Sequence, residues 1–322
     1  MRLEQPGDLG VDLAPQRPGA LVLRTPILAA AGCLGYAVEA VGQVDLSALG
    51  AVVTRGTTLH ARAGGPAPRM ADAPGGLLHA LGHQNPGITA VLERHAPRWA
   101  TWEVPVILSL VATSAEEFAA LAERTDGIPG ISGLELDLGS VESGRKGRPI
   151  SYDASSVGHF TAAVRAATEL PLLVKLSITS PDLRSVGRAA AEAGADALDC
   201  GSGPPALLQS RHAMLSGPAI GPLALRAVTE LARRSRLPIV GCGGVATLGD
   251  VIAMLDAGAT AVAVGTAMLA DPALPGRLAS ELAGQRPPQS AATASKASRS
   301  SSGPATPSNL AVSVPSSSTT KM

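Results

Sequence analysis

The chain has 322 residues, 45% of them hydrophobic, which provides enough apolar surface for one large core. Its 26 basic residues balance its 26 acidic residues, so no net charge is available to hold a nucleic acid or an anionic membrane. Aromatic residues make up only 2% of the chain, which argues against a stacking surface for single-stranded nucleic acid.

The first 20 residues are predicted to form an N-terminal extension or hairpin. Pro6, Gly7 and Gly10 interrupt this segment, which has neither the apolar core of a signal peptide nor an amphipathic helical pattern. Elsewhere no apolar run approaches the length of about 20 residues that spans a bilayer. We therefore expect a cytoplasmic protein with no membrane partner.

Between residues 21 and 286, short apolar segments alternate with longer segments of helical pattern. The apolar segments are hydrophobic nearly throughout, as are the strands of a parallel sheet that is covered on both faces. Strands are predicted at 26–32, 51–58, 105–112, 133–139, 171–177, 195–201, 238–244 and 261–267. Helices are predicted at 114–124, 155–168, 182–193, 222–234 and 248–257.

This alternation predicts a fold class. Eight strands that alternate with helices over about 250 residues are typical of a single α/β domain of the (β/α)8, or TIM-barrel, type. An open doubly wound sheet is disfavoured, because residues 31–35 after the first strand lack the G-x-G-x-x-G turn of that fold. The start of the helix predicted at 114–124 supports this assignment, because Ser114 precedes Glu117 at the spacing of a capping box.

The C-terminal segment 287–322 differs in composition from the rest, being rich in Ser, Thr, Ala and Pro. It has hardly any periodic apolar positions, so it cannot bury enough surface to offset the entropy lost on ordering. We predict a disordered tail.

The cysteines and histidines give no metal signal. Cys33, Cys200 and Cys242 form no C-x-x-C pair and no ligand spacing, and small buried thiols in a reducing compartment are expected. His79 and His83 are predicted to lie in a loop before a helix, with no carboxylate at ligand spacing. No metal site is predicted.

Two glycine-containing strand ends are candidates for a phosphate site, because the active site of a TIM barrel lies at the C-terminal ends of its strands. The last two predicted strands end in Gly243-Gly244 and Gly265-Thr266. Both place backbone N–H groups beside a helix start, which is the usual phosphate-binding arrangement of this fold. Glycines that only permit tight turns are the alternative, but two such pairs on adjacent strands favour phosphate.

Charged residues also occur at the strand ends. Lys175 interrupts the apolar segment 172–176, and a buried lysine is rare unless it is paired or functional. Its charge suits a phosphate, or an oxygen that becomes negative during a reaction. Arg55 ends the second predicted strand, and Asp137 ends the fourth. Glu135 lies two residues before Asp137 on that strand, so the two side chains are expected to point to the same side of the sheet.

Together these motifs resemble the class 1 dihydroorotate dehydrogenases over residues 11–282. Their order and spacing carry the resemblance, which rests on Thr-Arg-Gly-Thr-Thr at 54–58, Gly-His-Gln-Asn-Pro-Gly at 82–87, Val-Lys-Leu-Ser at 174–177, Leu-Ser-Gly-Pro-Ala-Ile at 215–220, Gly-Cys-Gly-Gly at 241–244 and Val-Gly-Thr-Ala at 264–267. The Gln-Asn-Pro-Gly form is most similar to subclass 1B. That subclass pairs with an electron-transfer subunit that carries an iron–sulfur cluster and FAD.

The resemblance implies FMN at the strand ends of the barrel 21–286. Its phosphate would be held by Gly243, Gly244, Gly265 and Thr266, with Gly217 under the ribityl chain or phosphate. Lys175 would lie at the flavin ring and stabilise its anionic reduced form, and the implied further contacts are Ala31, Gly32, Arg55, Gly56, Ser109 and Asp137.

The resemblance also implies a substrate site. In the family, the fourth strand continues as Asn-x-Ser-Cys-Pro-Asn, in which the Cys removes a proton from dihydroorotate. Ser140 stands at this position and is predicted to be catalytic, as is Lys175. The predicted substrate contacts are Arg55, His79, Asp137, Glu142 and Ser202.

Several substrate positions depart from the family pattern. Asp137 and Glu142 replace asparagines that hold the pyrimidine, and each unpaired buried polar contact costs about 1–3 kcal/mol. Ser140 also needs a neighbouring acceptor for its hydroxyl proton, for which Asp137 is one candidate. The segment 140–152 is predicted to be a lid or an ordinary surface loop.

Three functions follow as hypotheses. The first is oxidation of dihydroorotate to orotate in pyrimidine biosynthesis, with hydride transfer to N5 of FMN. The second is an FMN-binding paralogue that oxidises or reduces another small ring. The third is a non-redox phosphate-binding barrel. For any of them we expect a small-molecule substrate and a homo-oligomer.

Overall fold

The computed structural model describes residues 9–17, 21–140, 144 and 147–285. Glu142 and the predicted disordered tail at 287–322 lie outside these residues, and so do residues 141–143 and 145–146 of the predicted lid. The predicted division into domains stays a prediction.

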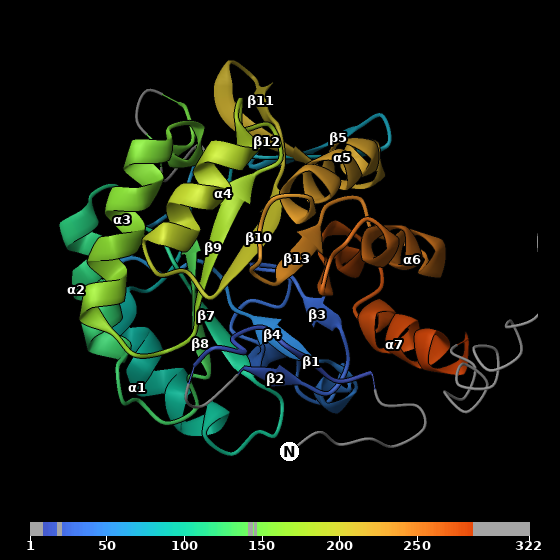
Figure 1. Ribbon diagram of the computed structural model, residues 1–322, viewed down its shortest axis with the longest axis horizontal. Helices are drawn as coiled ribbons and strands as arrows, with labels where there is room; N and C mark the ends of the chain where they lie inside the picture. The colour runs from blue at the N-terminus through green and yellow to red at the C-terminus, as the bar shows by residue number, and fades with distance from the viewer. Residues whose placement is uncertain (1–8, 18–20, 141–143, 145–146, 286–322) are drawn as a thin grey trace, which may run out of the picture. The chain divides into compact units, whose positions relative to one another are not determined.

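Parallel strands close into a barrel in the order β10-β13-β14-β3-β4-β7-β8-β9, which confirms the predicted fold class (Figure 1). Each barrel strand overlaps one predicted segment. Their bounds are β3 Ile27–Ala29, β4 Ala51–Val53, β7 Val106–Leu110, β8 Gly133–Asp137, β9 Leu172–Ser177, β10 Ala197–Ser202, β13 Ile239–Cys242 and β14 Ala261–Val264.

Helices lie around the outside of this barrel (Figure 1). The α-helices are α1 Ile88–Trp99, α2 Ala115–Thr125, α3 Ala154–Ala167, α4 Leu183–Glu192, α5 Gly221–Ala232, α6 Leu248–Asp256 and α7 Leu274–Gln285. Between β3 and β4 the described chain has only the short 3-10 helices η1 Val38–Ala40 and η2 Leu46–Ala48. Further 3-10 helices are η3 Ile150–Tyr152, η4 Pro218–Ile220 and η5 Thr266–Leu269. None of the helices in the described residues is long and apolar enough to cross a membrane.

Local capping determines where several helices begin. The Ser114 side chain accepts a hydrogen bond from the backbone N of Glu117 at the start of α2. Thr247 and Asp250 form a reciprocal capping box at the start of α6. Each cap satisfies backbone donors that the first helical turn leaves unpaired.

The barrel strands are apolar throughout because both of their faces are covered. Ile27 and Ala29 pack in the large cluster shared with the helices, whereas Leu28 belongs to a separate cluster with residues of the other barrel strands. The second cluster also contains Leu13, which follows β1 (Val11–Asp12), and Leu23 of β2 (Val22–Leu23). The hairpin β1–β2 therefore packs against residues inside the barrel, and it extends past the predicted boundary at residue 20.

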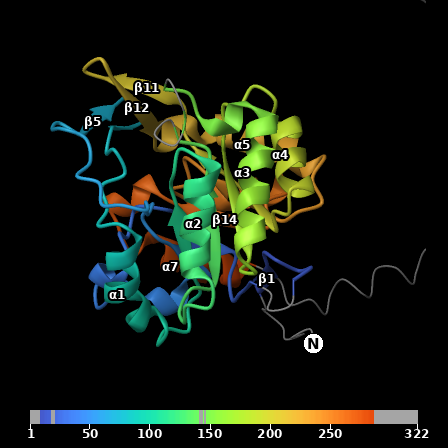
Figure 2. The ribbon, with the colours of Figure 1, turned by 90° about the vertical axis from the view of Figure 1, so that its left-hand side faces the viewer.

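A second sheet lies over the C-terminal ends of the barrel strands and was absent from the sequence prediction (Figures 1 and 2). It has the order β11-β12-β6-β5, from β5 Met70–Ala73, β6 Gly76–His79, β11 Pro205–Leu208 and β12 Arg211–Ser216. The prediction that His79 lies in a loop was wrong, because His79 ends β6 and pairs with Met70 and Met214. These strands are short and partly exposed, so they lack the continuous apolar pattern that reveals the barrel strands.

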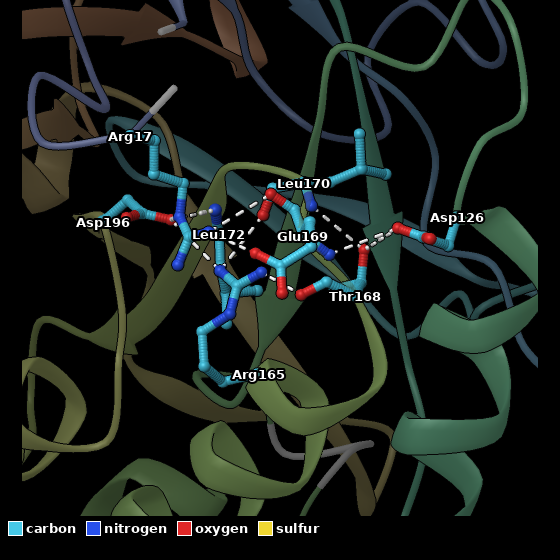
Figure 3. A network of polar contacts seen from close by, with 8 residues as sticks. All are labelled: Arg17, Asp126, Arg165, Thr168, Glu169, Leu170, Leu172 and Asp196. Carbon is cyan, nitrogen blue, oxygen red and sulfur yellow. Dashed lines mark hydrogen bonds and ion pairs between the residues drawn. The ribbon is translucent and has the colours of Figure 1, made fainter. Parts of the chain in front are cut away.

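A polar network lies at the opposite end of the barrel strands (Figure 3). Asp196, just before β10, accepts hydrogen bonds at Oδ2 from Arg17 Nε at 2.6 Å, Arg165 Nη1 at 3.3 Å and the backbone N of Leu172 at 2.9 Å. One carboxylate thus joins the segment after β1, helix α3 and the start of β9. Residues at this end of a TIM barrel stabilise the fold, and the chemistry lies at the other end.

Candidate active site

A cavity of roughly 450 Å³ is lined by residues at the C-terminal ends of the barrel strands and by the second sheet. This volume lies within the range of small-molecule sites, which is about 300–1,000 Å³. Of the predicted site residues, those that line the cavity are Ala31, Gly32, Arg55, Gly56, His79, Ser109, Asp137, Ser140, Lys175, Ser202, Gly217, Gly243, Gly244, Gly265 and Thr266. The cavity therefore brings together every predicted site residue that the structure describes. Their individual roles stay predictions.

One side of the cavity is built from backbone that only glycine allows. Gly217 has φ +96° and Gly244 has φ +78°, both in the left-handed region. A Cβ on Gly244 would lie 2.5 Å from the Cα of Gly221, and a Cβ on Gly217 would lie 2.8 Å from the Cα of Gly76. Gly217 directly precedes η4 and Gly265 directly precedes η5, and the backbone N–H groups at such helix starts suit an anion such as a phosphate.

Lys175 lies on the cavity floor between two carboxylates. Its Nζ is 3.2 Å from Glu135 Oε2 on β8 and 3.2 Å from Asp199 Oδ2 on β10, and all three residues are buried. Ser109 on β7 donates a 2.7 Å hydrogen bond from Oγ to the other Glu135 oxygen. The predicted common orientation of Glu135 and Asp137 is confirmed, since Glu135 contacts Lys175 and Asp137 lines the cavity above.

The protonation of this cluster follows from burial and the close charges. Burial disfavours the Lys175 ammonium, but Asp199 and Glu135 outweigh it and hold the pKa of Lys175 well above its usual value. Burial raises the pKa of Asp199 to about 8, and the Glu135 charge acts in the same direction. Burial opposes ionisation of Glu135 as well, but Lys175 brings the pKa of Glu135 below its usual value. At neutral pH the cluster holds one ammonium, one carboxylate and one protonated Asp199.

Ser140 lies beside His83 at the mouth of the cavity. His83 Nε2 is 3.1 Å from Ser140 Oγ and 4.0 Å from Asp137 Oδ2. The other Asp137 oxygen accepts hydrogen bonds from the backbone N atoms of Gly139 at 3.1 Å and Ser140 at 3.0 Å. Asp137 therefore fixes the turn that carries Ser140, whereas the Ser140 hydroxyl itself contacts a histidine.

The position of His83 is fixed by its own loop. Asn85 donates a 2.8 Å hydrogen bond from Nδ2 to the His83 carbonyl and accepts bonds at Oδ1 from the backbone N atoms of Thr58 and Gly87. Gly56 leaves room for the ring, since a Cβ there would lie 3.1 Å from His83 Nδ1.

The second sheet supplies an apolar side to the cavity. Met70, Leu77 and Met214 from its strands line the cavity, as does Leu81 just after β6. Met70 and Leu81 are also exposed to solvent. Sequence reasoning missed these residues because it missed the sheet.

The sequence prediction also missed Asp199. It is the single acid in β10, just as Lys175 is the single base in β9, and the two are register partners across these strands. A pair of opposite charges at the same level of two neighbouring buried strands is the signal that could have found it.

The comparisons with known proteins agree with this architecture. The family model described as "Dihydroorotate dehydrogenase" matches residues 20–285. The chain belongs to the dihydroorotate dehydrogenase family. The resemblance stated from the sequence is confirmed, including its subclass.

Two relatives in this family illustrate the match. The chain is 39% identical over 272 residues to "Dihydroorotate dehydrogenase B (NAD(+)), catalytic subunit" of Desulforudis audaxviator, covering 81% of this chain and 89% of the relative. It is 38% identical over 288 residues to the protein of the same name from Geobacter sulfurreducens, covering 86% and 93%.

A solved structure shares the fold. The structure of DHODH from Eimeria tenella in complex with ferulenol superposes with a TM-score of 0.73 at 19% sequence identity. The superposition covers 87% of this chain and 85% of that one.

Proposed function

We propose that the chain is an FMN-dependent oxidoreductase acting on a CH–CH bond, and that it oxidises dihydroorotate to orotate in pyrimidine biosynthesis. The observation that carries this proposal is a single cavity in which Lys175, Ser140 and the glycines at 243–244 meet, in a chain of the dihydroorotate dehydrogenase family. Members of this family are flavoproteins.

The residues present fit FMN. At Gly217 and Gly244 a Cβ would clash with the backbone of Gly76 and Gly221, so glycine is needed for the close backbone packing of this cavity wall. Gly243, Gly265 and Thr266 would complete the phosphate site. Ala31 and Gly32 would lie along the ring, with Arg55, Gly56, Ser109 and Asp137 as the remaining contacts. When bound, FMN would supply a two-electron acceptor for hydride.

Lys175 would stabilise negative charge at the cofactor. Its ammonium is buried, kept protonated by its acidic neighbours Glu135 and Asp199, and held on the cavity floor. A preorganised cation in a site that excludes water stabilises developing negative charge more strongly than a cation in solvent.

The substrate would lie between this floor and the second sheet. Ser140 Oγ would take the proton from the substrate carbon next to the one that loses hydride. Arg55 would pair with the substrate carboxylate, and His79, Asp137, Glu142 and Ser202 are the proposed polar contacts.

A second candidate is favoured by one observation. Asp137 lines the cavity as a carboxylate where the family uses a neutral amide, and this adds negative charge beside a negatively charged substrate. The alternative is therefore an FMN-dependent paralogue that acts on a small ring without a carboxylate.

We further propose a protein partner. The relatives are named catalytic subunits of an NAD(+)-dependent enzyme. An iron–sulfur, FAD-containing subunit would then carry electrons away from this chain. Homo-oligomerisation and a cytoplasmic location stay predictions.

Product formation tests this proposal. Purified protein supplied with FMN and an artificial electron-accepting dye should convert dihydroorotate to orotate, with dye reduction equal to the orotate formed. Dye reduction by another dihydro ring but not by dihydroorotate would favour the second candidate. Failure to bind FMN at all would reject both.

A further inference from the structure

The contact between His83 and Ser140 joins two segments that are 57 residues apart in the chain. We infer that His83 is the proton acceptor for Ser140, so that the two side chains together form the base that the reaction needs. The inference rests on the proposed function and adds a residue to it.

The distance fits this role. Ser140 Oγ lies 3.1 Å from His83 Nε2, within the range of about 2.6–3.2 Å that joins a hydroxyl to the base that activates it. A neutral imidazole with its proton on Nδ1 presents Nε2 as an acceptor, so the Ser140 hydroxyl donates to it. A serine hydroxyl without such an acceptor is a weak base at neutral pH.

The backbone holds His83 in an uncommon conformation to make this contact. Its φ is +47°, in the left-handed region that residues other than glycine seldom adopt. Such conformations cluster at functional sites, where the surrounding structure enforces them. Here the surroundings are the hydrogen bond from Asn85 to the His83 carbonyl and the space left by Gly56.

Asp137 completes the arrangement. Its Oδ2 lies 4.0 Å from the same Nε2 atom that Ser140 contacts. In a hydrolytic triad the carboxylate binds the other ring nitrogen, so this geometry is different. Here Asp137 lies on the same side of the ring as Ser140, and its other oxygen accepts a hydrogen bond from the backbone N of Ser140. Asp137 therefore positions Ser140 against His83.

The proton path balances. The C5 proton of dihydroorotate goes to Ser140 Oγ as the Ser140 hydroxyl proton goes to His83 Nε2. The electron pair of the broken C5–H bond forms the C5=C6 bond, and FMN, when bound, would supply the acceptor for the C6 hydride. The His83 side chain is 15% exposed, so the imidazolium can release its proton to solvent.

A thiol at position 140 tests the pairing without flavin or substrate. In Ser140→Cys, the His83 imidazole should favour the thiolate, and iodoacetamide should alkylate Cys at 140 about tenfold faster at pH 6 than in Ser140→Cys/His83→Gln. Asp137, Arg55, His79 and Lys175 line the same cavity and are present in both variants, so the comparison isolates His83. Equal alkylation rates in the two variants would overturn the inference.

The native cysteines are expected to react slowly with iodoacetamide and so should not mask alkylation at position 140. Cys200 and Cys242 are buried, and burial raises the pKa of both thiols. Burial also raises the pKa of Cys33 to about 11. Mass spectrometry of the peptide that contains position 140 separates its alkylation from any at these three sites.

Kinetics give a second readout. His83→Gln should lower kcat for dihydroorotate about 100-fold or more, with KM changed less than about threefold, and should remove the limb of the pH–rate profile that reports the base. Added imidazole should restore part of the rate in His83→Ala. The matched control is His159→Gln on the outer surface of α3, which should keep the wild-type rate and profile.

The two proposals fail in different ways. A wild-type enzyme that makes no orotate would reject dihydroorotate as the substrate and leave the thiol comparison to decide the role of His83. A His83→Gln enzyme with the wild-type pH profile and kcat would overturn the role of His83 and leave the proposed function intact.

Discussion

Lys175 Nζ lies 3.2 Å from Asp199 Oδ2, and the two residues are register partners on the neighbouring strands β9 and β10. Glu135 approaches the same ammonium from β8 at 3.2 Å. The cavity floor therefore carries a positive charge fixed by two carboxylates from the strands on either side. Its position is set by the barrel, and no loop is needed to hold it.

Replacing Lys175 with Ala should weaken FMN binding at least about tenfold and lower the free energy of unfolding by about 3–5 kcal/mol. The second effect arises because the buried Glu135 carboxylate loses its cation and the buried Asp199 side chain loses a polar partner. Fluorescence titration with FMN and urea unfolding measure the two quantities. The matched control is Arg188→Ala, a cation on the exposed face of α4 whose side chain is 71% exposed, which should change neither. Wild-type FMN affinity in Lys175→Ala would contradict the placement of this lysine at the cofactor.

The raised pKa of Asp199, about 8 against an ordinary value of 3.8, makes the stability depend on pH. Between these values the folded protein keeps a proton that the unfolded chain releases, so stability falls as pH rises through this window. The slope from this group is at most about 1.4 kcal/mol per pH unit. Lys175 keeps its proton throughout this window, and the pKa of Glu135 is lowered from its usual value. Asp199 is therefore the group of this cluster that titrates in the upper part of the window.

Asp199→Asn isolates this effect, because the amide resembles the protonated acid and does not titrate. Urea unfolding at about pH 5, 6, 7 and 8 should show wild type losing stability relative to Asp199→Asn at each step. A constant difference between the two proteins across this range would show that Asp199 is ionised throughout.

Gly244→Ala should abolish detectable FMN binding in the phosphate cradle. The new Cβ would lie 2.5 Å from the Cα of Gly221 and would need φ +78°, which an alanine adopts only with strain. Gly249→Ala is the matched control, because Gly249 is an exposed helical residue of α6 with its nearest neighbouring atom at 3.6 Å. Gly249→Ala should bind FMN normally and gain about 0.5–1 kcal/mol of stability. Normal FMN affinity in a folded Gly244→Ala variant would contradict the proposal that Gly244 forms part of the FMN phosphate site.

Asp196→Ala should separate stability from chemistry. The carboxylate joins Arg17, Arg165 and the backbone N of Leu172 at the end of the barrel away from the cavity (Figure 3). Its loss should cost about 2–4 kcal/mol in the free energy of unfolding, because two partly buried guanidinium groups lose their partner. At a temperature where the variant stays folded, its FMN affinity should match wild type. A large change in FMN affinity would mean that this network acts on the distant site.

The barrel and Lys175 on its cavity floor were predictable because their signals are local. Each barrel strand is a continuous apolar segment, and Lys175 is conspicuous within one of them. The glycines at 243–244 follow directly from the rule that active sites lie at strand ends.

The cavity's upper side was less predictable because its contacts join distant segments. β6 pairs with β12, more than a hundred residues later, and neither strand has a long apolar pattern. His83 was visible only as one of two loop histidines, and its contact with Ser140 depends on the left-handed backbone that the fold imposes. Pairing across such separations requires the three-dimensional structure.

The central claim is that the cavity holds a flavin that dihydroorotate reduces. The most direct measurement is an anaerobic titration of the FMN-loaded protein with dihydroorotate, followed by the visible absorbance of the oxidised flavin. We expect that absorbance to bleach with about one equivalent of substrate and orotate to form in equal amount. A flavin that stays oxidised at millimolar dihydroorotate would contradict the claim.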